Sequence, residues 1–348
     1  MIKISLRSYA LRRLLYIFPT LLGISIISFA LIAASPGDPI QIRLGLWIGE
    51  QPEYEEVYEQ VGFEIGVLDE NGEPVSVVVR YFRWLGLIKD QNGVRSGILQ
   101  GNLGNSWFYT QSGNQGKPIS DIIVGRLWYT LFLTTPAFII TTILATVIGV
   151  IQATRQYSLW DKGVTLASLI GFSMPIFWLA KLVMLSSFYL FNFTGAIQGD
   201  AFTEPFITNP KFYLFLILPT ITLILTGLVF LSRLTRSQLL DILRQDYITT
   251  ARAKGLSERK VIYKHAFRNA MLPIITVVGL ALPGLLGGSV MVEGVYGWPG
   301  LGSVFLISAL QRDQPMMMAT NFVFGGMFLA FRLLVDVSYA FVDPRIRY

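Results

Sequence analysis

The chain has 348 residues, of which 53% are hydrophobic and 14% are charged, and its formal net charge is +6. A soluble domain carries about 25% charged residues, so this composition indicates a membrane protein with several spans. The absence of cysteine excludes disulfides, thiolate nucleophiles and cysteine-bound metals, and a histidine-based triad would have to use His265, the single histidine.

Six apolar stretches are long enough to cross a bilayer as helices, which takes roughly 20 residues. The first follows four basic residues, but its 21 residues exceed the roughly 7–15 of a signal-peptide core, so we expect it to be retained. The sequence thus predicts an all-α membrane protein with six transmembrane helices: Leu14–Ala34, Trp128–Ala153, Val164–Leu190, Phe212–Leu231, Leu272–Val292 and Met316–Val342.

Lysine and arginine counts in the loops predict the orientation, because cytoplasmic loops are enriched in these residues. With the N-terminus inside, the segments 1–13, 154–163, 232–271 and 343–348 hold 17 Lys/Arg and 5 Asp/Glu. The outside segments 35–127, 191–211 and 293–315 hold 9 Lys/Arg and 16 Asp/Glu. We therefore expect a multi-pass protein of the cell (inner) membrane with both termini in the cytoplasm. The topology accounts for the excess of basic residues, so the net charge does not indicate binding to nucleic acid.

Three parts are expected along the chain. Residues 1–34 form the cytoplasmic tail and first helix, 35–127 an enlarged external subdomain, and 128–348 a core of five helices. Within the subdomain the stretch 50–73 is acidic, and 101–104 is rich in turn-forming residues. This subdomain is either a docking surface for an external partner or a solvated surface loop.

The polar segment 232–271, between the fourth and fifth predicted spans, has the pattern of ordered helices. Asp246 is a suitable N-cap for a short helix, Tyr247–Lys254, and Gly255 is a suitable end for it. Ser257 then begins a further helix that leads into the fifth span. We therefore expect a short exposed helix held between two turns.

This short helix has a composition that suits contact with another protein. Its small residues let a partner surface approach the backbone closely, and charged residues stand beside them. The small residues are Ala251, Ala253 and Gly255, and the charged ones are Arg252 and Lys254. Insertion into a groove on a soluble partner is one interpretation, and a solvated basic loop that only fixes the topology is the other.

Charged side chains within the predicted spans are candidates for a translocation path, because such charges normally face the protein interior or a water-filled cavity. Lys181 lies in the third span, from which it can also reach the interface. Glu293 ends the fifth span near Trp298, where it would line an external gate or only cap that end. Arg332 and Asp336, four residues apart in the sixth span, either form a structural ion pair or line the path.

Several motifs, in order along the chain, resemble the permease subunits of binding-protein-dependent, ATP-driven (ABC) importers. The strongest is Asp246-Tyr-Ile-Thr-Thr-Ala-Arg-Ala-Lys-Gly255 with His265-Ala-Phe-Arg-Asn-Ala270, which is similar to the cytoplasmic loop of the dipeptide/oligopeptide branch. Against the general family pattern only Ala251 and Gly255 match, and the departures are those usual in that branch. Further resemblances lie at Gly101–Ser106, Val292–Gly302 and Asp336–Arg347.

The resemblance implies the type I importer permease fold and a heteromeric transporter. Its other members would be a second homologous permease, two ATPase subunits and an external substrate-binding protein. The helix around Ala251–Gly255, with Asp246 and Tyr247 at its start, would be the coupling helix seated in an ATPase groove. ATP and Mg would bind to the ATPase subunits, leaving this chain without a cofactor. Peptides would be the solutes, with nickel chelates, glutathione and oligosaccharides as alternatives.

Two other classes of function, a secondary transporter or channel and a membrane enzyme, are the alternatives to an ABC importer subunit. No Walker A run is present, so we expect a transport subunit without its own ATPase site. An ATP-independent secondary transporter or channel is the alternative, and it would favour inverted repeats or a ring of polar pore residues. A membrane enzyme would need clustered acid–base residues or metal ligands, and the sequence offers neither a catalytic nor a metal-binding group of that kind.

Overall fold

The protein is described by a computed structural model that covers residues 6–44, 54–110, 116–197, 210–281 and 290–342. The chain divides into two compact units. Unit 1 consists of residues 1–126, 304–333 and 337–348, and unit 2 of residues 127–303 and 334–336. Both units are built mainly from helices, as the composition predicts.

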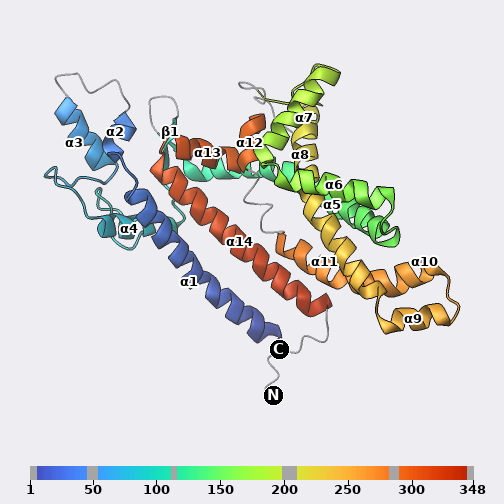
Figure 1. Cartoon of the computed structure of the whole chain (residues 1–348). Coiled ribbons are helices and arrows are strands. Elements are labelled where there is room, and N and C mark those ends of the chain that lie inside the picture. Colours follow the sequence, from blue (N-terminus) through green and yellow to red (C-terminus); the bar gives the residue numbers. More distant parts are fainter. Residues whose placement is uncertain (1–5, 45–53, 111–115, 198–209, 282–289, 343–348) are drawn as a thin grey trace. The chain divides into compact units, whose positions relative to one another are not determined.

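Unit 1 contains two long apolar helices and a set of shorter elements between them in sequence. Helices α1 and α14 run side by side (Figure 1), and Gly325 of α14 lies against Leu21 and Ile24 of α1. The segment between them in sequence contains a small antiparallel pair of strands that the all-α prediction did not include. The elements are α1 (Leu6–Ala33), α2 (Pro39–Leu44), α3 (Tyr54–Glu64), α4 (Val77–Leu85), η1 (Ile98–Gln100), β1 (Asn105–Thr110), β2 (Gly116–Pro118) and α14 (Gln314–Val342).

A buried carboxylate fastens the hairpin of unit 1 to the start of α14. Asp313 is 1% exposed, and its Oδ2 accepts the backbone N–H groups of Trp107 and Phe108, each at 3.0 Å, and the hydroxyl of Ser106. Its Oδ1 accepts the N–H of Met316 at 3.1 Å, in the first turn of the helix. One side chain thus satisfies donors from two segments about 200 residues apart in sequence.

Replacing Asp313 by alanine is expected to loosen this junction by at least about 2 kcal/mol, because several buried donors lose their acceptor at once. Hydrogen exchange at the amides of Trp107 and Phe108 then becomes faster than in the parent chain. Asp313→Asn keeps the shape and one acceptor oxygen, so a smaller change is expected. Unchanged exchange in Asp313→Ala would show that the carboxylate does not hold the hairpin.

Unit 2 contains the long helices α5 and α8, and the shorter helices α6, α7, α11 and α12 pack against α8. Helix α5 begins in unit 1 and continues into unit 2, and α13 begins in unit 2 and continues into unit 1. The elements are α5 (Ile119–Thr154), α6 (Leu159–Ser173), α7 (Ile176–Phe191), α8 (Pro210–Leu243), α9 (Asp246–Ala253), α10 (Glu258–Lys260), the π-helical segment η3 (Val261–Phe267), α11 (Arg268–Ala281), α12 (Val290–Tyr296) and α13 (Leu301–Leu310).

Glycines allow α5 and α8 to approach each other closely. A Cβ at Gly149 of α5 would lie 2.5 Å from the Thr235 side chain, and a Cβ at Gly227 of α8 would lie 2.6 Å from that of Thr141. Membrane helices commonly use small residues in this way, because close backbone contact supplies the packing energy that the hydrophobic effect does not. The two helices therefore approach each other closely at these two glycines.

Four described helices are long and apolar enough to cross a membrane, or up to six if each of two bent pairs counts as one span. The predicted third span, Val164–Leu190, is wrong as a single helix: α6 and α7 meet at 114°. Pro175 has no N–H for the helix, and Met174 before it takes an extended conformation, so the break falls there.

The predicted fifth span, Leu272–Val292, includes residues 282–289, which lie outside the described residues, so it stays a prediction. The segment 293–315 was expected to be an external loop, but it contains most of α12 and all of α13, apolar helices that meet at 83°. Gly297, Trp298, Pro299 and Gly300 form the break between them.

Candidate coupling site

Helix α9 lies where the sequence predicts the short helix between two turns. α8 extends to Leu243, well beyond the predicted fourth span, and α9 follows after a two-residue turn. The helix begins one residue earlier than predicted: Asp246 is its first residue, and Gln245 is the N-cap, without a side-chain hydrogen bond. Gly255 ends the turn with φ +75°, a left-handed conformation that favours glycine, as predicted.

The inner face of α9 is part of a hydrophobic cluster. Ile248 is fully buried and Ala251 is 8% exposed. The cluster joins α9 to four other elements of unit 2. Its other members are Val150 and Ala153 of α5, Leu239 of α8, Val261 and Ala266 of η3, and Ala270 of α11. The interpretation of Ala251 as a small residue on the partner-facing surface is therefore wrong: it is small because α9 packs closely on this cluster.

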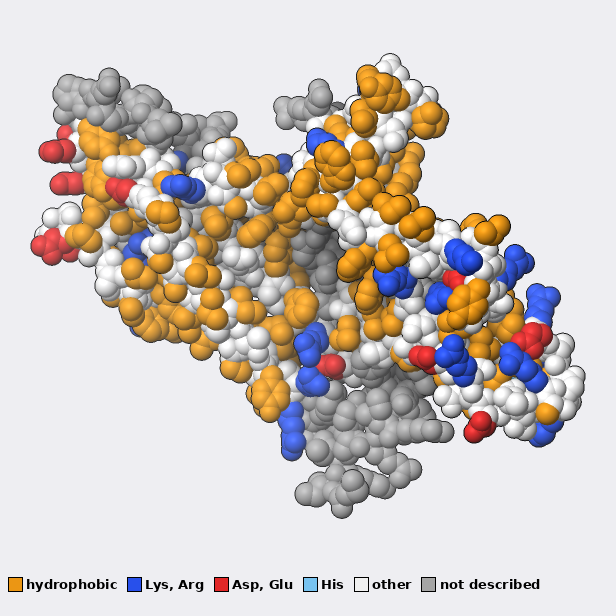
Figure 2. Space-filling model, viewed as in Figure 1, with side chains coloured by type: hydrophobic (Ala, Val, Ile, Leu, Met, Phe, Trp, Pro, Cys, Tyr) orange, Lys and Arg blue, Asp and Glu red, His pale blue; other side chains and the backbone are white. Residues whose placement is uncertain are grey.

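The outer face of α9 is polar and accessible. We define the outer face of α9 by its exposed residues. Figure 2 shows Lys and Arg side chains gathered over the part of unit 2 that holds α9 and α10. Ala253 and Gly255 are exposed, so they are small residues on an accessible surface, as predicted. The outer face consists of Asp246, Tyr247, Thr249, Thr250, Arg252, Ala253, Lys254 and Gly255.

Two side-chain contacts hold α9 in place. The guanidinium of Arg252 donates from Nε and Nη2 to Glu258 of α10, at 3.1 and 2.6 Å. The hydrogen bond from Arg252 lowers the pKa of Glu258, and the same pairing raises the pKa of Arg252. Asn269 of α11 donates to the hydroxyl of Tyr247 at 2.9 Å. Asn269 lies within the second motif quoted above and Glu258 lies between the two motifs, but the sequence gives no sign of which residues they contact.

A buried ion pair fastens the α5–α6 turn to α8 close to this cluster. Arg236 of α8 donates from Nε and Nη2 to the two carboxylate oxygens of Asp161, at 2.8 and 2.9 Å. The Asp161 side chain is 4% exposed and also accepts the N–H of Tyr157 at 2.9 Å. Tyr157 has φ +64°, so this bond stabilises an unfavourable backbone conformation. The partners are 75 residues apart, and nothing in the sequence indicates their contact.

The path candidates Glu293 and Trp298 lie together in the interior of unit 2. Both are fully buried, and the N–H of Trp298 donates to the backbone carbonyl of Glu293 at 2.8 Å. The Glu293 carboxylate accepts bonds from Thr130 Oγ1 at 3.1 Å and from the Ser303 N–H at 3.0 Å. A Cβ at Gly300 would lie 2.5 Å from this carboxylate, which explains the glycine there. A gate role for either residue stays a prediction, since neither reaches a surface of unit 2.

The other path candidates lie on separate helices. Lys181 is exposed on α7, Arg332 is exposed on α14, and Asp336 is half-buried on α14. The predicted ion pair between Arg332 and Asp336 stays a prediction, as does a role in the path for any of the three. In the described ranges no group of three or more His, Cys, Asp or Glu residues could hold a metal ion.

Comparison with known proteins places the chain in a family. Residues 145–348 match the family described as binding-protein-dependent transport system inner membrane component. The oligopeptide transport system permease protein AppB of Bacillus subtilis is 38% identical over 348 residues, covering 98% of this chain and 99% of that protein. The dipeptide transport system permease protein DppB of Escherichia coli is 33% identical over 361 residues, covering 98% of each.

A solved structure of the MetNI methionine ABC transporter in an inward-facing conformation is 18% identical, with a TM-score of 0.48, and covers 65% of this chain and 99% of that chain. The two permease relatives match this chain over nearly its whole length, at more than 30% identity, and the family match covers more than half of it. The chain therefore belongs to the binding-protein-dependent transport system inner membrane components, the permease subunits of ATP-driven importers.

Proposed function

We propose that this chain forms half of the translocation pathway of a peptide importer and that α9 couples it to an ATPase subunit. The observation that carries the proposal is the division of α9 into two faces. Its inner face is anchored in the cluster with Ile248 and Ala251, and its outer face is polar, accessible and held by Arg252 and Tyr247. Such a helix suits a groove on a soluble protein.

The anchoring of α9 supports a mechanism in which the helix transmits movement. Its cluster contains side chains of α5, α8, η3 and α11, so a displacement of α9 moves a packed body rather than a flexible loop. Closure of a pair of ATPase subunits would displace α9 and, with it, α8 and α11. The pathway would then alternate between inward-open and outward-open states by rigid-body movement. ATP and Mg bind to the ATPase subunits in this scheme, and this chain holds no cofactor.

The distribution of charge supports the corresponding orientation. The segment that carries α9 has 9 Lys/Arg against 3 Asp/Glu between residues 232 and 271. By the enrichment of basic residues in cytoplasmic loops, α9 and both termini lie in the cytoplasm, and residues 35–127 lie outside. An external substrate-binding protein then delivers the solute on the side of residues 35–127, and a second homologous permease completes the pathway.

The substrate class is proposed from the printed names of the relatives, which are oligopeptide and dipeptide permeases. Cells that lack this chain are expected to lose uptake of short labelled peptides and to regain it with the wild-type chain. Tagged chain purified in mild detergent should bring a second permease, two ATPase subunits and the binding protein, as identified by mass spectrometry. Recovery of the chain alone, with uptake that continues without ATP, would contradict the proposal. Normal peptide uptake without the chain would point to nickel chelates, glutathione or oligosaccharides instead.

A further inference from the structure

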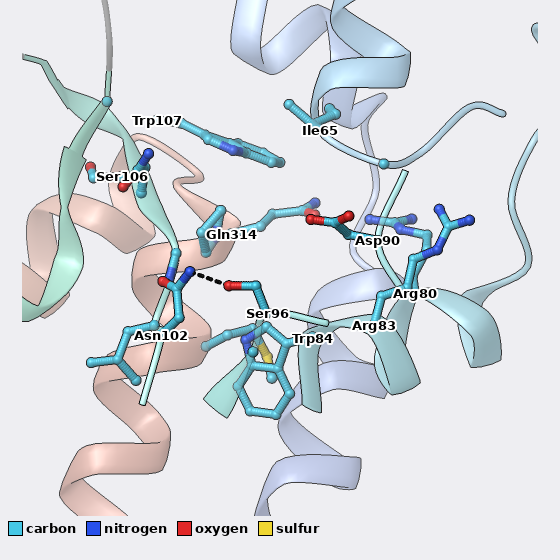
Figure 3. A pocket seen from close by; sticks show the side chains of 18 of the residues that line it. Ile65, Arg80, Arg83, Trp84, Asp90, Ser96, Asn102, Ser106, Trp107 and Gln314 are labelled. Atoms are coloured by element: carbon cyan, nitrogen blue, oxygen red, sulfur yellow. Dashed lines mark hydrogen bonds between the residues drawn. The ribbon is translucent and has the colours of Figure 1, made fainter. Parts of the chain in front are cut away.

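A pocket in unit 1 has a chemistry that the coupling mechanism does not use. Its volume is about 420 Å³, and its walls come from the last turn of α1, from α4, from residues 96–107 and from the start of α14. Further lining residues, which include one more arginine and two carboxylates, are Arg43, Glu64, Ile65, Gly66, Asp90, Gln91 and Gly116. Figure 3 shows Arg80, Arg83 and Trp84 of α4 around this pocket, with Asp90 near the arginines and Asn102 bonded to Ser96 across it at 2.6 Å. Aromatic and aliphatic side chains from α1 and α14 complete the lining.

Polar donors in this pocket lack acceptors. Nε and Nη1 of Arg83 and Nε1 of Trp84 are buried and have no hydrogen-bond partner among the described residues. Arg80 is half-buried, and burial lowers its pKa. Asp90 uses Oδ1 to accept the N–H groups of Asn92 and Val94, and in the described part of the chain no ion pair within 4.0 Å joins it to either arginine. A buried guanidinium group without an acceptor, as at Arg83, is costly, so the donor set fits an anionic ligand with several oxygens.

The position of α4 places the pocket beside the membrane-spanning helices rather than out in solution. The hydroxyl of Tyr81 lies 2.8 Å from Ser25 Oγ, and Trp84 packs edge-on against Phe322 of α14 with ring centroids 6.0 Å apart. The pocket itself is lined by the last turn of α1 and the first turn of α14. Because residues 12–33 and 314–336 are both candidate spans, the pocket lies at the end of two spans, where lipid head groups meet the outermost part of the acyl chains.

The outward side of α4 is apolar, as expected of a helix in contact with lipid. Val77, Val78 and Phe82 are 46%, 63% and 39% exposed, while Arg80 and Arg83 point to the pocket on the other side of the helix. This division of residues is typical of helices that lie in the membrane interface. The same short element therefore presents an apolar surface to acyl chains and basic donors to whatever anion accompanies them.

We propose that this pocket binds the phosphodiester head group of a membrane phospholipid, with Arg80, Arg83 and Trp84 Nε1 as donors to the phosphate oxygens. The guanidinium fork matches a phosphate through two N–H groups at once. The aromatic side chains of Phe29 and Trp84 line the pocket where the glycerol and first methylenes would lie. Free inorganic phosphate offers the same oxygens but nothing for these apolar walls. The inference concerns unit 1 alone and does not depend on the substrate or coupling roles proposed above.

The test is lipid retention by the full chain, purified in mild detergent with its co-purifying subunits and examined by native mass spectrometry. The wild-type chain is expected to retain a phospholipid after washing, and Arg80→Gln with Arg83→Gln is expected to lower its occupancy at least about tenfold. Lys89→Gln with Arg95→Gln removes the same charge from exposed positions outside the lining, and we expect it to retain the lipid. Trp84→Phe removes one donor with little change in shape, and an intermediate loss is expected.

Three outcomes would overturn the proposal. The first is equal retention in the Arg80/Arg83 and Lys89/Arg95 variants. The second is a washed wild-type chain that holds no phospholipid and does not rebind it from vesicles of phosphatidylethanolamine and phosphatidylglycerol. The third is that inorganic phosphate or a dipeptide, added to delipidated chain, binds with the same dependence on Arg80 and Arg83 while phospholipid does not. If the double variant does not fold, the Trp84→Phe and Lys89/Arg95 variants decide, since lipid loss is then expected in the first and not in the second.

Discussion

Substitution of Ala253 by tryptophan is expected to abolish ATP-driven uptake while the chain still folds and inserts. Ala253 is exposed on the outer face of α9, so a large side chain there meets no part of unit 2 but prevents a partner from closing on the helix. Loss of at least about 2 kcal/mol of docking free energy corresponds to roughly thirtyfold weaker binding of the ATPase subunit. Co-purification of the ATPase and ATP-dependent uptake measure the two effects.

Two further substitutions on α9 serve as controls for this prediction. Ala253→Ser keeps the side chain small, and uptake is expected to remain near the wild-type level. Ala251→Trp places the same bulk on the inner face, where the cluster is filled, so overpacking is expected to reduce the amount of folded chain itself. If Ala253→Trp retained both ATPase binding and uptake, α9 would not be the coupling helix and the solvated-loop interpretation would return.

Removal of the Asp161 carboxylate is expected to lower the free energy of unfolding by about 3 kcal/mol, which is the lower end of the range for a broken buried ion pair. The Asp161 side chain is 4% exposed while that of Arg236 is 27% exposed, so water partly compensates the arginine left behind. Tyr157 also loses the acceptor that stabilises its left-handed backbone conformation. The apparent unfolding temperature of detergent-purified Asp161→Ala should fall accordingly.

A double-mutant cycle distinguishes this ion pair from a general effect of mutation. Asp161→Leu combined with Arg236→Met replaces the pair by apolar side chains of similar reach. The cycle needs the two single variants Asp161→Leu and Arg236→Met beside the double variant. Because no charge is left without a partner in the double variant, it is expected to be more stable than Asp161→Leu alone. Strictly additive losses for the two positions would show that the two side chains do not act together.

Local sequence signals were sufficient for the broad architecture and for the position of α9. Long apolar stretches predict the spans, and Gly255 marks the end of α9, because both signals depend on residues close together in the chain. The prediction of a single helix for Val164–Leu190 was wrong because it rested on hydropathy alone. Pro175 lacks the N–H that a continuous helix needs, so the helix breaks there. Average apolarity does not reveal such a break.

The contacts that give the candidate site its geometry could not be predicted. Arg236 and Asp161 are far apart in sequence, and their pairing depends on how α8 packs beside the α5–α6 turn. Ala251 and Ala253 are equally small and only two residues apart, yet one is buried and the other exposed. Composition treats them alike, and only the direction from which the hydrophobic cluster meets α9 distinguishes them.

The π-helical geometry of Val261–Phe267 fixes the rotational phase between the coupling loop and α11. Val261 and Ala266, five residues apart, are both fully buried in one cluster. An α-helix would turn residues at that spacing well away from each other, whereas i→i+5 bonding brings them to the same side. Removing one residue from this segment would restore regular α-helical bonding, but it would also rotate everything before it by about 100° relative to α11. The extra residue thus sets the direction in which α9 points, so the length of this segment cannot change without reorienting α9.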